Sequence, residues 1–158
     1  MLIVLRHAKA VHVAGMADFE RPLTEQGELD ARRAGAVLGR LGPAPDLVLC
    51  SPAVRARRTA ELALTEFAPA APIRHERGIY LAEPEELLDL VRLVDADVRT
   101  LLLVGHNPGV HELIRALTGD TDDRRFPPGA FAAIEAENGW ADLWPGGGRA
   151  VAGWCPDT

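Results

Sequence analysis

The chain begins MLIVLRHAKA (residues 1–10). Residues 2–5 form an uninterrupted apolar run, which is typical of a strand covered on both faces, and the run stops abruptly at Arg6 and His7. Two neighbouring basic groups repel each other, and neither belongs in a hydrophobic core, so the pair needs a local reason. A phosphate bound at the end of the strand is such a reason, because both groups can contact an oxyanion.

Length and charge bound the class of protein. With 158 residues, of which 47% are apolar, the chain is long enough to bury one core, and we expect a single domain over residues 1–158. Its 17 Lys and Arg against 23 Asp and Glu give a formal net charge of -6, which argues against general binding to nucleic acid or to anionic membranes. Any basic site must therefore be local.

The sequence also indicates the compartment. Cys50 and Cys155 have no CxxC spacing, so they predict neither a disulfide framework nor a zinc site and fit a reducing cytoplasm. Residues 2–5 are too short for the core of a signal peptide, and nowhere do about 18 apolar residues follow one another, as a membrane span requires. We therefore expect a soluble cytoplasmic protein, and the high usage of Ala, Arg and Gly indicates a GC-rich bacterial genome.

Further apolar runs alternate with amphipathic segments along the chain. Residues 47–50 and 101–104 repeat the pattern of the first run and predict two more buried strands. A helix is predicted to begin after Thr24, a good N-cap, and to end at Gly42. Three more helices are predicted to begin at Ser51 and Pro52, at Pro84, and at Asn107 and Pro108.

This alternation predicts an α/β fold, arranged as a single-domain, three-layer α/β/α structure around a mostly parallel central sheet. Residues 130–137 resemble one more strand, with residues 140–144 as a hairpin partner through Asn138 and Gly139. We expect the Gly- and Pro-rich segment from about residue 145 to form a turn and a loose tail. The order of the strands does not follow from the sequence.

Polar residues follow each of the three predicted inner strands. Ligands of parallel α/β sheets bind beyond the carboxyl ends of the strands, where loops lead into helix N-termini. Taken singly, each such residue has a structural explanation, for example a salt bridge for an arginine or a helix cap for a serine. Their common location instead favours one site for a multiply charged anion. The residues are Arg6 and His7 after the first strand, Ser51 and Arg55 after the second, and His106 and Asn107 after the third.

The phosphate interpretation gives these groups distinct tasks. A neutral imidazole is a good nucleophile near neutral pH, and the neighbouring Arg6 favours the uncharged form of His7. His7 could attack phosphorus and carry the group as phosphohistidine, from which water releases phosphate. Arg6, Arg55 and a protonated His106 would contact the phosphoryl oxygens more strongly in the transition state. This chemistry requires no metal and no cofactor.

Four segments in the same order resemble the histidine phosphatase superfamily, the phosphoglycerate mutase-like proteins. MLIVLRHAKA resembles the family's opening, with its RHG signature present as RHA, and three further segments resemble later motifs: RPLTEQGELDARRAG, SPAVRARRTAE and VGHNPG. The resemblance spans residues 2 to about 119 and implies a phosphoglycerate mutase-like fold. It also implies His7 as the phosphorylated nucleophile, Arg6 and Arg55 as phosphate clamps and His106 as the second catalytic histidine, with Arg21 as a candidate substrate contact. Ser51 and Asn107 are further candidate substrate contacts because of their place at the strand ends.

Within the superfamily, the chain resembles most the small SixA-type phosphohistidine phosphatases. Members of that group are similar in length and share the form DxxRPLTxxG, here residues 18–27. Members of the mutase branch are longer, with insertions that cover the site, and this chain has little room for such a lid. The resemblance therefore implies an open groove and a phosphorylated protein as the partner, most simply one that carries phosphohistidine.

The chain departs from the family pattern at two places. Ala8 replaces the signature glycine. Many relatives carry a glutamate that acts as general acid in the region corresponding to residues 78–83, and Glu83 and Asp18 are the candidates here. A phosphoramidate leaving group is protonated more readily than a sugar alkoxide, so a weak or absent acid would favour phosphohistidine as the substrate.

Three alternative functions remain open from the sequence. In a metallohydrolase, His7, His106 and a carboxylate would hold iron or zinc, although Arg6 and Arg55 would oppose a bound cation. A non-enzymatic or weakly active module would bind phosphorylated proteins without turning them over. A phosphatase of this family could also act on a small phosphomonoester.

Overall fold

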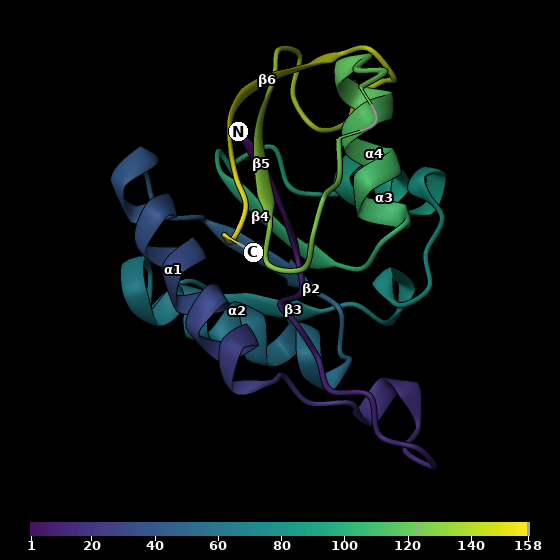
Figure 1. Cartoon of the computed structure of the whole chain (residues 1–158). Coiled ribbons are helices and arrows are strands. Elements are labelled where there is room, and N and C mark those ends of the chain that lie inside the picture. Colours follow the sequence, from purple (N-terminus) through teal and green to yellow (C-terminus); the bar gives the residue numbers. More distant parts are fainter. Residues whose placement is uncertain (123, 158) are drawn as a thin grey trace.

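A six-stranded sheet forms the middle layer of the computed structural model, which describes residues 1–122 and 124–157 (Figure 1). The strands are β1 (Leu2–Arg6), β2 (Leu47–Cys50), β3 (Ile73–His75), β4 (Leu101–Gly105), β5 (Phe131–Ala136) and β6 (Gly148–Trp154). The helices are α1 (Glu25–Leu41), α2 (Val54–Phe67), α3 (Pro84–Arg92) and α4 (Gly109–Thr118), with two 3₁₀ turns, η1 (Asp18–Glu20) and η2 (Arg77–Ile79).

The sheet brings the ends of three inner strands to one edge. Its order is β3-β2-β4-β1-β5-β6, with parallel pairing from β3 to β1 and antiparallel pairing of β1 with β5 and of β5 with β6. Arg6 at the end of β1 pairs with Gly105, and Cys50 at the end of β2 pairs with Val104. The predicted α/β fold with a mostly parallel sheet is confirmed, and β4 lies between β1 and β2.

Alternating side chains of the inner strands fill two cores. Val4, Leu49 and Leu103 pack with residues of α3 and α4, whereas Leu5 and Val104 pack with residues of α1 and α2 on the other face. Figure 1 shows these two pairs of helices on opposite sides of the sheet. Each fully buried Leu or Val contributes roughly 1.5–3 kcal/mol relative to an exposed one, which is why these runs must lie at the centre.

Some predicted helix ends are confirmed and two are wrong. Thr24 is the N-cap of α1, where its Oγ1 accepts from the Gly27 N–H at 2.9 Å, and Pro84 is the first residue of α3. However, α2 begins at Val54 and α4 at Gly109, so Ser51 and Asn107 are not caps. The Ser51 hydroxyl accepts from the Ala53 N–H just before α2 at 3.3 Å and also contacts the ring of His106, and the Asn107 amide donates to the Phe126 carbonyl.

The predicted hairpin partner of the last strand is also wrong. Residues 140–144 form turns, because the Trp140 ring is buried in the core beneath α3 and its Nε1 donates to the Val98 carbonyl at 2.7 Å. Besides β1, β5 pairs with β6, so residues 148–154 are not a loose tail. Residue 158, the end of that expected tail, lies outside the described residues.

The edge strand β3 was not predicted, because all three of its residues are exposed and carry no buried apolar pattern. Nor does any helix within the described part of the chain have the length and apolar character that crossing a membrane requires.

Candidate active site

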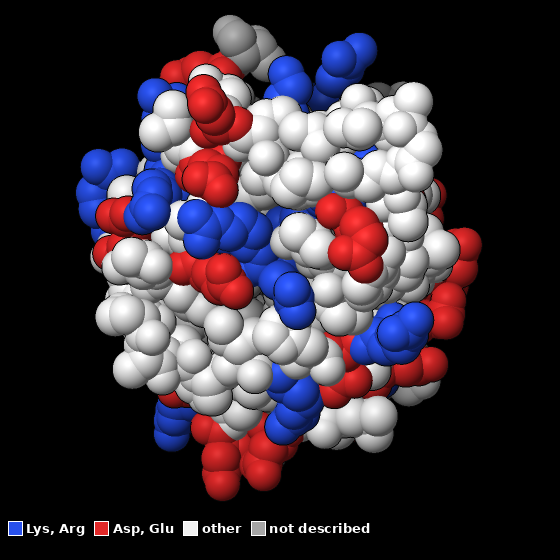
Figure 2. Space-filling model, turned by 90° about the horizontal axis from the view of Figure 1, so that it is seen from below, with Lys and Arg blue, Asp and Glu red and all other residues white. Residues whose placement is uncertain are grey.

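The structure brings four of the predicted residues together at the carboxyl edge of the sheet. The rings of His7 and His106 lie 5.1 Å apart between centroids, and Arg55 Nε donates to His7 Nε2 over 3.4 Å. Arg6, the last residue of β1, lies close enough for its charge to act on both histidines. Figure 2, which views the molecule from below, shows Lys and Arg side chains gathered in the middle of this face with acidic side chains beside them.

The His7 ring has a defined orientation. Its Nδ1 lies 2.8 Å from the Ala8 carbonyl, and since a carbonyl only accepts, Nδ1 carries the proton and Nε2 keeps its lone pair. Burial, then the charges of His106, Arg55 and Arg6, lower the pKa of His7 from 6.5 to about 3, against the raising effect of the Ala8 carbonyl. The ring is therefore neutral at pH 7, and the lone pair on its Nε2 accepts the hydrogen bond from Arg55 Nε.

The departure at Ala8 is accommodated by the backbone. Its N–H donates to Thr59 Oγ1 at 2.9 Å, and the same hydroxyl donates to the Arg55 carbonyl at 2.7 Å. Among the residues that the structure describes, only Leu81 combines a side chain beyond glycine with a positive φ, so Ala8 adopts a conformation open to any residue. Thr59 thereby links the residue after His7 to the helix that carries Arg55.

Asp18 holds the guanidinium of Arg55. Its backbone carbonyl accepts from Arg55 Nη1 at 2.7 Å, and its carboxylate accepts from Nη2 at 3.0 Å. Tyr80 and Arg21 also donate to this carboxylate, at 2.6 and 3.0 Å. Hydrogen bonds from Tyr80, then Arg21 and Arg55, hold the pKa of Asp18 well below its usual range. An ionised carboxylate has no proton to give, which disfavours Asp18 as a general acid.

His106 is also neutral in the free protein. Burial, then the charge of Arg55, lowers its pKa from 6.5 to about 4, while Asp18 acts in the opposite direction. Its Nε2 lies 2.7 Å from Ser51 Oγ, so Ser51 orients the ring.

Asn107 shares a backbone acceptor with Arg6 at the margin of the site, and Glu83 lies at the surface. Arg6 Nη1 and Asn107 Nδ2 both donate to the Phe126 carbonyl at 3.0 Å. Glu83 is the exposed N-cap of α3, and its backbone N–H donates to Glu86 at 3.1 Å. Within the described part of the chain, three buried side-chain atoms of the site make no hydrogen bond: Arg6 Nε, His106 Nδ1 and Asn107 Oδ1.

Two contacts of the site escaped the sequence analysis, Tyr80 and the Phe126 carbonyl. Neither belongs to one of the four recognised motifs, and a single aromatic residue in a loop carries no pattern of its own. Residues 1–122 and 124–157 contain no group of three or more His, Cys, Asp and Glu side chains that could hold a metal ion.

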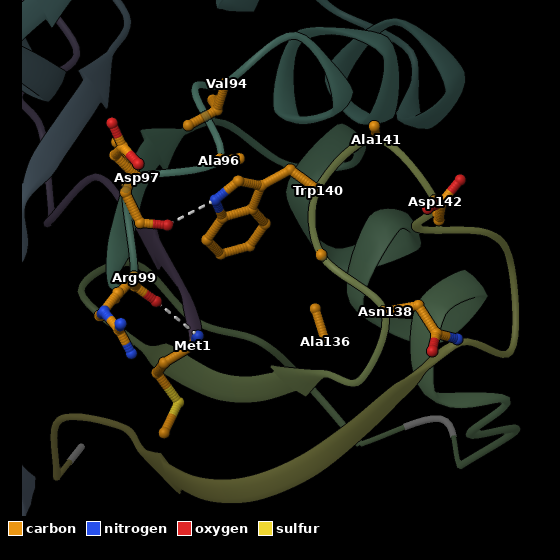
Figure 3. A pocket seen from close by; sticks show the side chains of 12 residues that line it. Met1, Val94, Ala96, Asp97, Arg99, Ala136, Asn138, Trp140, Ala141 and Asp142 are labelled. Carbon is orange, nitrogen blue, oxygen red and sulfur yellow. Dashed lines mark hydrogen bonds between the residues drawn. The ribbon is translucent and has the colours of Figure 1, made fainter.

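A hollow of about 630 Å³ lies at the opposite end of the sheet, around the residues that precede β1 and β4 (Figure 3). The Trp140 ring lines it, and the Met1 amine donates to the Arg99 carbonyl beside it at 2.9 Å. It contains none of the histidines or arginines of the candidate site, so it is a separate feature of the surface.

The fold and the paired histidines between arginines agree with the comparisons with known proteins. The model of the histidine phosphatase superfamily (branch 1) matches residues 2–80. The chain belongs to this superfamily.

Within the superfamily, similar proteins include SixA structures and an uncharacterized relative. A candidate phosphohistidine phosphatase SixA from Nakamurella multipartitia is 31% identical, with a TM-score of 0.86 over 99% of this chain and 96% of that one. Another from Agrobacterium tumefaciens is 27% identical, with a TM-score of 0.85 over 98% and 97%. The uncharacterized protein Rv1276c of Mycobacterium tuberculosis is 36% identical over 151 residues, 90% of this chain and 93% of that protein.

The two site histidines should make stability depend on pH. Their pKa values of about 3 and about 4 lie below the ordinary 6.5, so the unfolded chain binds more protons than the folded one between these limits. Stability is fully present above pH 6.5 and is lost as the pH falls through this window, by about 2 kcal/mol per histidine at pH 5. We expect urea unfolding to show this loss between pH 7.5 and pH 5.

The His106→Gln variant separates the two contributions, because it should keep about half of the pH dependence. Carboxylates such as Asp18 also have a lowered pKa in the folded protein. They reduce the stability only at a more acidic pH, below the ordinary pKa of 3.8. Equal stability of the unaltered protein at pH 7.5 and pH 5 would contradict the burial of two neutral histidines.

Proposed function

We propose that the protein is a metal-independent phosphatase that carries the phosphoryl group on His7 and acts on phosphohistidine in a partner protein, as SixA-type enzymes do. The observation that carries this proposal is the neutral His7, whose Nε2 lone pair faces Arg55 at 3.4 Å in a buried, positively charged site. This arrangement suits an oxyanion, and the charges of Arg6 and Arg55 would oppose a metal cation.

In the first step, His7 Nε2 attacks phosphorus and forms a P–N bond. The bond between phosphorus and the leaving nitrogen or oxygen breaks, and its electron pair goes to the leaving atom, which takes a proton from solvent. Arg6 and Arg55 stabilise the charge that spreads over the phosphoryl oxygens. Arg6 Nε is buried without a partner, so it can donate to such an oxygen without losing another bond.

In the second step, water attacks phosphorus, the P–N bond to His7 breaks, and inorganic phosphate leaves with the proton released to solvent. The bound phosphoryl group offsets the charge of Arg55 and raises the pKa of His106, so that this ring becomes a cationic donor when it is needed. The unpartnered Nδ1 of His106 is the atom available for that bond.

The leaving group is inferred from the state of the two candidate acids. Asp18 is held ionised by three donors, and Glu83 caps α3 at the surface. A strong general acid matters most for an alkoxide, whereas the nitrogen of a phosphoramidate accepts a proton readily. This difference favours phosphohistidine over a sugar phosphate or another alkyl phosphomonoester.

The surroundings of the site support a protein as the partner. The segment between β1 and α1 projects from the body of the molecule (Figure 1), and its Val13 and Met16 are exposed near Asp18. Leu81, next to Tyr80, is 75% exposed. Apolar side chains at the rim of an anion site fit a protein surface better than a small polar metabolite.

Both cysteines are free thiols, as expected in a reducing environment. We infer that the protein acts in a bacterial cytoplasm.

Three substrates test the proposal in buffer that contains EDTA: a protein phosphorylated on histidine, p-nitrophenyl phosphate and glycerol phosphate. We expect the first two to be hydrolysed and glycerol phosphate to react at least about 100-fold more slowly, since an absent acid costs about that much for a poor leaving group. Labelled phosphate trapped in alkali should appear on His7.

Each alternative has its own outcome. Equal rates with glycerol phosphate would favour a phosphatase of small phosphomonoesters. Loss of activity in EDTA would favour a metallohydrolase. Tight binding of the phosphorylated protein without release of phosphate would favour a binding module, and each of these results contradicts the proposal.

A further inference from the structure

Tyr80 contacts several groups of the site at once. Its hydroxyl donates to Asp18 Oδ2 at 2.6 Å, the oxygen that also accepts from Arg55 Nη2 at 3.0 Å. Its ring meets the His106 ring nearly at a right angle, with centroids 5.4 Å apart, and the Arg55 guanidinium carbon lies 6.0 Å from its centroid. Tyr80 therefore lies against both the cation and the second histidine of the site.

The turn that carries Tyr80 is packed closely against the segment that carries His106. A Cβ on Gly109 would lie 2.3 Å from the Ala82 carbonyl oxygen, and one on Gly105 would lie 3.1 Å from the Ile79 side chain. At Gly109 only glycine allows the two backbones to approach so closely, while at Gly105 the close neighbour is the Ile79 side chain. The position of the phenol relative to the second histidine is thus fixed by packing.

Leu81 has a φ of 59°, in the left-handed region. This conformation is strained for a bulky residue and persists only where its surroundings hold it. The buried Ile79 anchors one side of the turn in the core, while the Leu81 side chain itself is mostly exposed. The strained backbone at Leu81 therefore sets the direction of the chain next to Tyr80, because the Leu81 side chain gains little packing from it.

Most N–H groups of the Arg55 guanidinium already donate to neighbouring residues. Of its five N–H groups, one points to His7 Nε2, one to the Asp18 carbonyl and one to the Asp18 carboxylate, which leaves one hydrogen on each Nη for a phosphoryl group. The position of Asp18 therefore decides where these two remaining donors point.

Asp18 itself needs an anchor, because its side chain is 49% exposed on the projecting segment. Arg21 cannot serve, since its bonds go to Asp18 and to the Val11 carbonyl, all within that same segment. Tyr80 and Arg55 are the groups that bond the Asp18 carboxylate to the rest of the molecule.

We propose that Tyr80 is a positioning residue that fixes Asp18 and, through it, the Arg55 fork that receives the phosphoryl group. The expected effect of Tyr80 on kcat rests on the proposed phosphatase function, whereas its expected effect on the position of Arg55 does not. Removal of the hydroxyl leaves the ring in place and frees the carboxylate from its anchor, so the guanidinium gains freedom and leaves His7 Nε2 part of the time.

The Tyr80→Phe variant tests this proposal with two readouts. First, with ¹⁵N-labelled histidine and no substrate, the Nε2 resonance of His7 should move toward that of a free neutral imidazole. Second, kcat for p-nitrophenyl phosphate should fall about tenfold with KM nearly unchanged, as expected for a lost hydrogen bond to a charged group. Thr65→Val, which removes an exposed hydroxyl bond on α2, is the control and should change neither readout.

The Arg55→Lys background shows whether Tyr80 acts through Arg55. Lysine lacks the fork, so Tyr80→Phe should lower kcat no further there. An equal loss in both backgrounds, or an unchanged His7 resonance in the single variant, would overturn the proposal. If the unaltered protein hydrolyses nothing, the proposed function fails, and the resonance alone decides the role of Tyr80.

Discussion

His7→Ala is expected to lower the rate of phosphate release from p-nitrophenyl phosphate by roughly a thousandfold or more, because no other group can replace the nucleophile. Steady-state kinetics at pH 7.5 measure the loss, and labelled phosphate should no longer be trapped on the protein. The circular dichroism spectrum and the thermal midpoint show whether the variant is folded.

His75→Ala is the matched control, because His75 is an exposed histidine on the edge strand β3. It should keep full activity. A folded His7→Ala protein that still turns over substrate would remove His7 as the nucleophile and, with it, the mechanism proposed above.

Arg55→Ala is expected to lower kcat/KM roughly a hundredfold. The loss of a charge-assisted contact to the phosphoryl oxygens removes about 3 kcal/mol of transition-state stabilisation. The same change takes a cation away from His7, so the pKa of that ring should rise and its titration should move toward pH 6.5. The pH dependence of kcat/KM, together with an NMR titration of His7, measures both effects.

Arg57→Ala provides the comparison, because Arg57 is an exposed arginine on α2, two residues along the same helix. Its loss should leave kcat/KM unchanged. Full activity of Arg55→Ala would show that the phosphoryl group is not held by this guanidinium.

Much of the fold follows from the sequence. The runs at residues 2–5, 47–50 and 101–104 predict β1, β2 and β4, because strands buried on both faces exclude polar residues almost completely. Thr24, Gly42 and Pro84 mark helix ends by local backbone chemistry that needs no tertiary contact. The meeting of Arg6, His7, Arg55 and His106 follows from one rule, that parallel strands end at the same edge; their catalytic roles stay predictions.

The remainder depends on tertiary contacts without a local signal. Ser51 would be a reasonable helix cap, but a buried imidazole competes for its hydroxyl. Trp140 fits the pattern of a strand, but its ring is buried beneath α3 and its segment leaves the sheet. Tyr80 bonds to a residue 62 positions earlier in the chain, and no spacing rule reaches that far.

The place of β4 between β1 and β2 has a consequence for biosynthesis. His7, the proposed nucleophile, and both arginines lie within the first 55 residues, yet β1 and β2, which carry or precede them, do not pair with each other. A nascent chain on the ribosome therefore holds all three without a formed centre until residues 101–105 have emerged and joined both strands. The proposed phosphatase activity is therefore expected only after these residues have joined the sheet.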